Sequence, residues 1–264
     1  MPLNFPTQKS AIVVAHPDDE ILWFSSILDH VETIIICFLS VESQPQWTAG
    51  RLKSKAEYPL ENVMWLELSQ SESFNAADWQ NPVATSYGLE VSNTRYKQNY
   101  PILKKRLLEH LNGVKAVYTH NPWGEYGNEE HVQVYRVLKE IQKDMKYDMW
   151  FSNYCSNRSL ALMQADEHAL VSEHVTLDTN MSLTAEIKHL YQKNSCWTWY
   201  DKWAWLERET FILDRDCDDY TESAGTMIPI NLIQVGEPSP SQKKKGLIES
   251  CINRLHRYGR RLLK

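Results

Sequence analysis

A short apolar run that stops at a proline is the feature that most constrains this chain. Residues 11–15 read Ala-Ile-Val-Val-Ala, which predicts a fully buried strand. The strand cannot continue past Pro17, which lacks an N–H and has a fixed φ. The segment His16-Pro17-Asp18-Asp19-Glu20 is therefore expected at the carboxyl end of a buried strand, where open α/β sheets bind their ligands.

This segment carries donor atoms for a metal ion. His16 offers a nitrogen, and Asp18 and Asp19 offer oxygens. Neighbouring residues outside regular structure point in different directions, so one carboxylate can bind an ion while the other faces a bound water. Catalytic zinc takes three ligands from His, Asp or Glu and keeps a fourth position open. We expect two ligands from His16 and Asp19. The third is expected from His131, which follows a predicted strand over 115–120 and a glycine-containing loop.

The sequence Ala15-His16-Pro17-Asp18-Asp19-Glu20 resembles the signature of the PIG-L/LmbE-like family of zinc-dependent N-deacetylases. The resemblance covers the chain from about residue 10 to about residue 145. It implies a Rossmann-like fold and one bound ion, zinc or alternatively iron(II), held by the three side chains named above. It also implies that Asp18 is the general base that accepts a proton from the attacking water.

One position departs from the family pattern. Relatives usually carry His-Pro-Asp-His in the downstream loop, whereas this chain has Asn128-Glu129-Glu130-His131, preceded by Tyr126. The Tyr126 hydroxyl is a candidate donor to the oxyanion of the reaction. Asn128 is kept as a catalytic candidate because an amide donates a hydrogen bond, although it cannot deliver a proton. We expect Asp18 to carry both proton transfers. The alternatives are help from either glutamate of this loop or from His120, or slow turnover.

The candidate substrate contacts are Arg51, Trp123 and Glu130. Arg51 is the nearest match to an arginine that the family carries on the helix before the third strand, and a solvated helix residue is an equal alternative. Residues 69–100 lack periodicity and contain several aromatics, so they are expected to form substrate-recognition loops. The aromatic cluster at 196–205 favours a packing role at the base of a cleft over direct contact with a sugar.

Alternating strands and helices predict an α/β fold. Strands are expected at 33–39, 62–68, 115–120, 147–154, 207–213 and 227–235, helices at 21–31, around 51–57, 102–111, 132–143 and 184–194, and mixed, mostly β structure over 158–183. Parallel strands joined by a helix form right-handed βαβ units. With the resemblance, this predicts a Rossmann-like three-layer sandwich with a mostly parallel sheet, a β-rich C-terminal portion and a basic amphipathic C-terminal helix. Residues 1–236 are expected to form the deacetylase domain.

Residues 237–264 are predicted to be a linker followed by a tail helix. In residues 243–264, eight Lys and Arg stand against one Glu, a net charge of +7, which leaves −13 for the rest of a chain of formal charge −6. One face of the predicted helix is apolar and the other cationic. Peripheral contact with an anionic membrane and docking on the acidic body or on a partner subunit are equal alternatives. The acidic body is not typical of a nucleic-acid binder.

Three features favour a cytoplasmic location, at the inner face of the membrane if the tail binds lipid. The five cysteines are scattered and form no C-x-x-C pair, which indicates a reducing compartment. The first ten residues lack a signal-peptide pattern. No apolar run reaches the roughly 18 residues of a transmembrane helix.

The predicted activity is hydrolysis of an acetamide on an N-acetylated amino sugar, linked to a nucleotide, a lipid or a glycan, in glycan biosynthesis. One alternative is an amidase acting on a larger amide conjugate. Another is a catalytically impaired metal-binding subunit of a glycan-biosynthesis complex, for which the replacement at Asn128 is the best support.

Overall fold

The computed structural model describes residues 9–166, 173–214 and 229–236. The chain divides into a compact unit, Met1–Ile233, and a second unit, Gln234–Lys264. The predicted linker and tail helix at 237–264 lie outside the described residues, so both they and the domain boundary stay predictions. In the part of the chain that is described, no helix has the length and apolar composition needed to cross a bilayer.

A seven-stranded sheet forms the centre of the first unit, in the order β3-β2-β1-β6-β7-β10-β9. The first five strands of this order are parallel, whereas β10 pairs antiparallel with both β7 and β9. The mostly parallel sheet of the predicted α/β class is confirmed. The strands are β1 Ser10–Val14, β2 Thr33–Ser40, β3 Val63–Ser69, β6 Ala116–Thr119, β7 Asp148–Ser152, β9 His174–Asp178 and β10 Arg208–Leu213.

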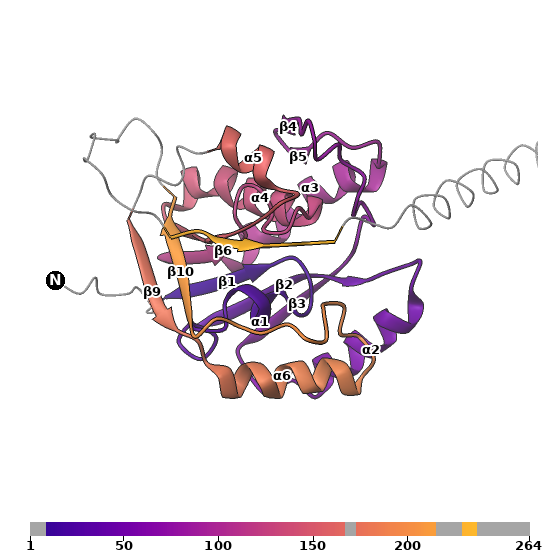
Figure 1. The fold of residues 1–264 in the computed structure, drawn as a ribbon, viewed down its shortest axis with the longest axis vertical. Coiled ribbons are helices and arrows are strands. Elements are labelled where there is room, and N and C mark those ends of the chain that lie inside the picture. The colour runs from indigo at the N-terminus through magenta and orange to yellow at the C-terminus, as the bar shows by residue number, and fades with distance from the viewer. Residues whose placement is uncertain (1–8, 167–172, 215–228, 237–264) are drawn as a thin grey trace, which may run out of the picture. The chain divides into compact units, whose positions relative to one another are not determined.

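Helices cover both faces of this sheet, which gives the predicted three layers. The helices α3, α4 and α5 lie on one face, and α2 and α6 lie on the other (Figure 1). The helices are α1 Asp19–Trp23, α2 Pro45–Ala56, α3 Thr94–His110, α4 Glu129–Met145, α5 Leu160–Ala165 and α6 Met181–Lys193. Two short strand pairs complete the unit, β4 Ala84–Thr85 with β5 Gly88–Leu89 and β8 Tyr154–Ser156 with β11 Asn231–Ile233.

The core explains why these segments adopt these elements. All five residues of β1 are buried, as expected for a β-branched strand with helices on both sides. The helix α4 buries Val134, Val137, Leu138 and Ile141, the periodic positions that predicted it. Each such side chain contributes about 1.5–3 kcal/mol when it is fully buried, so the strand and the helix that carry the site are fixed by the core.

The strand pairing of β1 and β6 places two loops side by side. The two strands are parallel, with Val13 opposite Thr119, and the backbone N–H of Ala15 donates to Nε2 of His120 at 2.9 Å. The carboxyl ends of both strands therefore lie at the same edge of the sheet.

Two predicted helices differ from the structure. The helix expected at 21–31 ends at Trp23, because the carboxylate of Glu209 accepts the backbone N–H groups of Ser25 and Ser26 at 3.2 and 2.7 Å. The helix expected at 102–111 begins at Thr94 and runs through Pro101, so the loop expected at 69–100 is shorter than predicted. The segment expected to be mostly β over 158–183 holds α5 as well as β9.

Candidate metal centre

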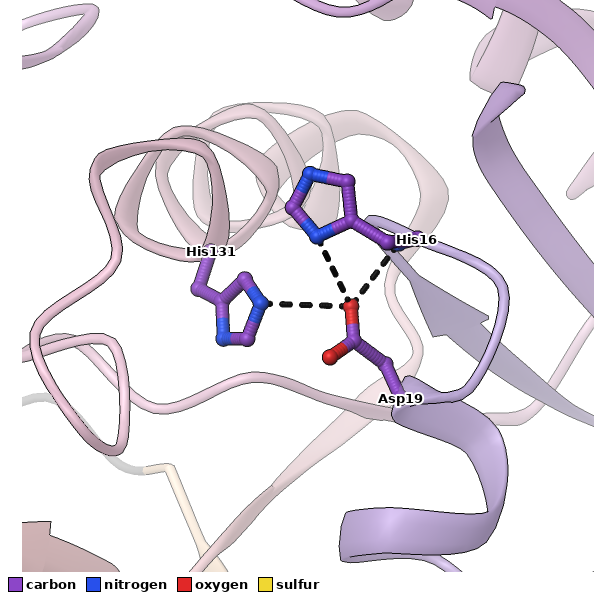
Figure 2. A group of neighbouring side chains, drawn as sticks. All are labelled: His16, Asp19 and His131. Atoms are coloured by element: carbon purple, nitrogen blue, oxygen red, sulfur yellow. Dashed lines mark hydrogen bonds and ion pairs between the residues drawn. The ribbon is translucent and has the colours of Figure 1, made fainter. Parts of the chain in front are cut away.

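Three side chains from the segments that follow β1 and β6 converge at this edge of the sheet. Nδ1 of His16 and Nε2 of His131 each lie 3.2 Å from Oδ2 of Asp19 (Figure 2). One donor atom from each residue lies within 4.8 Å of the others, and all three residues are buried. The structure thus brings together the three residues predicted as ligands.

Local backbone geometry aims these side chains. The backbone N–H of His16 donates to Oδ2 of Asp19 at 2.8 Å, which closes the turn after β1. The second loop turns at Gly124, which has a φ of +68°, and a Cβ there would lie 2.5 Å from the carbonyl oxygen of Asn128. Only glycine fits this position. The turn delivers His131 to the first turn of α4.

The three residues fit a bound cation. Nε2 of His131 is buried and makes no hydrogen bond to the residues that the structure describes, although it faces Asp19. Two imidazole nitrogens and one carboxylate oxygen are a common donor set of catalytic zinc. A tetrahedral ion with bonds of about 2.1 Å separates its ligand atoms by about 3.4 Å, close to the two observed contacts.

Electrostatics lead to the same interpretation. Burial alone would lower the pKa of His131, but the carboxylates of Asp19 and Glu125 raise it to about 10. Burial alone would raise the pKa of Asp19, but His131 and His16 hold it well below its usual range. The site therefore stabilises positive charge where the imidazoles face the carboxylate. A metal ion competes with the proton for the same nitrogen.

Carboxylates outside the ligand group orient both imidazoles. The Nε2–H of His16 donates to Oε2 of Glu130 at 2.8 Å, and Nδ1–H of His131 donates to Oε2 of Glu125 at 2.8 Å. Each ring thus keeps its other nitrogen for Asp19 and for an ion. The indole N–H of Trp23 donates to Oδ1 of Asp19 at 3.1 Å. Such contacts fix the tautomer and orientation of metal ligands.

A second group, His120, Glu125 and His131, also brings donor atoms within 4.8 Å of one another. Hydrogen bonds within the protein already occupy the donor atoms of this second group. Nε2 of His120 accepts the N–H of Ala15, so the proton of the neutral ring is on Nδ1, which donates to Glu125 Oε2 at 3.1 Å. Burial and the nearby His131 lower the pKa of His120, which keeps this ring neutral. This group therefore supports the first one rather than forming a second site.

Asp18, the predicted general base, lies beside the ligand group. It occupies the N-cap position of α1 with a φ of +99°, and its side chain does not cap the helix. Instead Oδ2 accepts the hydroxyl of Thr198 at 2.6 Å and the Thr198 N–H at 3.3 Å. Burial and the charge of Asp19 raise the pKa of Asp18 to about 6.

Tyr126 and Asn128 form a pair at the same edge. Oδ1 of Asn128 accepts the backbone N–H of Glu130 at 2.9 Å, which caps α4, and its Nδ2 donates to the Tyr126 hydroxyl oxygen at 2.7 Å. The Tyr126 ring lies 5.2 Å from that of His131, centroid to centroid. The two predicted catalytic residues of this loop are therefore adjacent to the candidate ion site.

The three predicted substrate contacts occupy buried positions. Arg51 is only 2% exposed and donates to the carbonyl of Leu39 at 3.2 Å. Trp123 is fully buried, and its indole N–H donates to the carbonyl of Tyr154 at 2.7 Å. Glu130 contacts His16, as described. The roles of all three as substrate contacts stay predictions. The buried position of Trp123 does not favour such a role for that residue.

The aromatic cluster packs against the site. The ring of Trp199 lies 4.6 Å from that of Tyr126 and 5.5 Å from that of the fully buried Trp23. The ammonium of Lys188 lies 5.2 Å from the rings of both Trp197 and Trp205. These contacts agree with the packing role expected for residues 196–205.

Sequence reasoning missed three residues that contact the predicted site. Trp23 follows Asp19 by four positions on a helix, a spacing that places both on one face and could have identified it. Glu125 lies in the loop that was singled out, but no pattern distinguishes it from its neighbours. Thr198 is 180 positions from Asp18, and no local signal connects the two.

The fold and this donor set define an α/β protein with a buried His-Asp-His group that could hold a metal ion, at the carboxyl end of a parallel sheet. The family described as PIG-L, GlcNAc-PI de-N-acetylase, matches residues 11–142, half of the chain. The chain belongs to this family. Family membership and the donor set together support a metal-dependent N-deacetylase.

One curated protein and two solved structures are similar to most of the chain. An uncharacterised protein, L374, of Acanthamoeba polyphaga mimivirus is 23% identical over 190 residues, which are 70% of this chain and 80% of that protein. A crystal structure of a deacetylase–teicoplanin complex from the teicoplanin biosynthesis pathway has a TM-score of 0.51 at 10% identity. The zinc-inhibited form of teicoplanin deacetylase Orf2 has a TM-score of 0.50 at 9% identity. Both alignments cover 80% of this chain and all of the other, and they show a shared fold.

Proposed function

We propose that this protein is a metal-dependent hydrolase that removes the acetyl group from an N-acetylated amino sugar. The observation that carries the proposal is the convergence of His16, Asp19 and His131, with Asp18 beside them, in a chain of the de-N-acetylase family. The sugar would be linked to a nucleotide, a lipid or a glycan. Membrane contact by the tail predicted at 243–264 would favour a lipid-linked saccharide.

We propose zinc as the ion, with iron(II) as the alternative, held by the two imidazoles and the carboxylate. When bound, the ion would lower the pKa of water to about 7 and draw electron density from the amide carbonyl. Glu130 and Glu125 would keep the imidazoles in the binding orientation.

Asp18 is the proposed general base. With a pKa of about 6, its carboxylate is mostly ionised at neutral pH and can accept the proton of the attacking water. The water oxygen bonds to the carbonyl carbon. The C–N bond then breaks as Asp18 passes the proton to the leaving amine. Acetate and a free amino sugar result, and no second acid is required.

The Tyr126 hydroxyl is the proposed donor to the oxyanion. Because Oδ1 of Asn128 is committed to the N–H of Glu130, its Nδ2 faces Tyr126 and donates. The tyrosine oxygen accepts this bond, which leaves the hydroxyl proton to donate elsewhere. Burial and the charge of Asp19 raise the pKa of Tyr126 well above its usual range, so the phenol stays protonated. Asn128 would thus orient a hydrogen-bond donor without delivering a proton itself.

Metal analysis combined with an acetate-release screen tests the proposal. The purified protein, loaded with zinc or iron(II), would be assayed on N-acetylhexosamines that are free, nucleotide-linked or lipid-linked, and on amides with larger acyl groups. We expect one ion per chain and release of acetate. Stoichiometric binding without release of any acid from these amides would refute the enzymatic proposal.

The rival function is a metal-binding subunit without catalytic activity. Asn128, where relatives usually carry a histidine, is the observation that favours it. The Asp18→Asn variant separates the two: a loss of activity with retained zinc supports the enzyme, because the chain then depends on a proton acceptor beside the ion.

A further inference from the structure

Thr198 contacts the predicted base from a distant part of the chain. Its hydroxyl donates to Oδ2 of Asp18 at 2.6 Å, and its backbone N–H donates to the same oxygen at 3.3 Å. The residue itself is exposed. Packing of the flanking Trp197 and Trp199 rings against Lys188 and Tyr126 holds the segment in place. The packing of its neighbours therefore holds Thr198 against Asp18.

Helix capping does not account for the direction of the Asp18 side chain. An aspartate at an N-cap normally accepts a backbone N–H of the first helical turn, but this carboxylate does not. Its φ of +99° is also costly for a residue other than glycine, by about 1–3 kcal/mol. The backbone N–H of Asp18 is held by Oε2 of Glu20 at 2.9 Å, whereas the hydrogen bonds found for its carboxylate come from Thr198.

We propose that Thr198 is a positioning residue that orients the Asp18 carboxylate for proton transfer. This inference rests on the proposed role of Asp18 as general base. The hydroxyl and the backbone N–H of Thr198 both donate to Oδ2 of Asp18. Oδ1 of Asp18 accepts no hydrogen bond from the residues that the structure describes. One oxygen of the carboxylate is thus fixed, and the other is left for the proton of the attacking water.

The expected effect is on turnover rather than on substrate binding. Removal of an outer partner that orients a functional group typically costs 10- to 100-fold in activity. We expect Thr198→Val, which keeps the shape and loses the hydroxyl, to lower kcat by about this factor with KM and zinc content unchanged. Thr198→Ser restores the hydroxyl and should recover most of kcat.

Thr179→Val is the matched control. The Thr179 hydroxyl donates to the carbonyl of Leu206 at 2.7 Å, a bond of similar length away from the site. We expect this variant to keep kcat. Equal losses in the serine and valine variants of Thr198, or full activity in both, would overturn the inference while the proposed function stands.

A double-mutant cycle tests the contact without any assay of activity. Melting temperatures are measured for Thr198→Val, Asp18→Ala and the double variant, all in the full chain. We expect the combined loss to be smaller than the sum of the single losses by about 2–4 °C, because each single change already removes the bond between the Thr198 hydroxyl and the Asp18 carboxylate. Strict additivity would overturn the inference, even if no substrate is found and the proposed function fails.

Discussion

The carboxylate of Glu130 lies 2.8 Å from Nε2 of His16, on the side of the ring opposite to Asp19. The backbone N–H and the hydroxyl of Ser71 donate to its other oxygen at 2.5 and 2.7 Å. Glu130, a predicted substrate contact, is thus placed to orient His16, a proposed metal ligand. This contact leads to a testable prediction.

The Glu130→Gln variant should bind zinc 10- to 100-fold more weakly, because the neutral amide no longer offers a charged acceptor to the imidazole. Competition with a chromophoric chelator measures the affinity. The control is Glu129→Gln. Glu129 is the adjacent buried carboxylate, whose Oε1 accepts the backbone N–H of Ala77 and the indole N–H of Trp79 rather than a nitrogen of His16. Equal affinities in wild type and Glu130→Gln would contradict the orienting role.

The Asp18→Asn variant should lose activity by about 10²- to 10⁴-fold, the usual contribution of a general base. Zinc content should stay at the wild-type value, since Asp18 is not in the proposed ligand group. Asp19→Asn, in contrast, should lose both zinc and activity. Steady-state kinetics and metal analysis of the two variants form the test, and unchanged turnover in Asp18→Asn would refute the base assignment.

The Tyr126→Phe variant should lower kcat by about 10²- to 10³-fold with little change in KM, as expected for the loss of one donor to a developing oxyanion. Asn128→Ala should lower kcat too, because the tyrosine loses the partner that directs its proton. It should also cost about 1 kcal/mol of stability through the lost helix cap. If Tyr126→Phe raised KM and left kcat alone, the hydroxyl would be a substrate contact instead.

Glu209 should lower the free energy of unfolding as pH rises through the range between its unfolded and folded pKa values. Burial raises the pKa of this carboxyl from about 4.5 to about 7. Between these values the unfolded chain releases the proton and the folded chain keeps it, so the free energy of unfolding decreases by about 3 kcal/mol. Glu209→Gln, which cannot release a proton, should make the fall in the free energy of unfolding smaller by about this amount, whereas the exposed Glu61→Gln should leave it unchanged. Urea unfolding at several pH values is the measurement.

The sequence predicts the parallel core and the ligand group because their signals are local. A β-branched run ending at Pro17, and a strand followed by a loop to His131, need only neighbouring residues to be interpreted. The end of α1 could not be predicted in this way, since the amides of Ser25 and Ser26 bond to Glu209, far along the chain.

The start of one helix and the position of one site residue differ from the prediction for a similar reason. The sequence pattern predicts that α3 begins after Pro101, whereas Asn93 caps the helix earlier by accepting the N–H groups of Arg95 and Tyr96. Trp123 is a predicted substrate contact, but its position in the loop does not reveal that its ring is buried in the core. Long-range packing decides these positions, and single-sequence patterns do not contain it.

The donor atoms of the candidate centre come from two segments, one after β1 and one after β6, that meet only when these strands pair. An unfolded chain cannot hold these atoms together, so an ion that binds here binds the folded state alone. At a free concentration one hundred times its dissociation constant, such an ion adds about 2.7 kcal/mol to the stability of the fold. The availability of metal would then govern how long the protein survives heat and proteolysis, separately from whether it turns over a substrate.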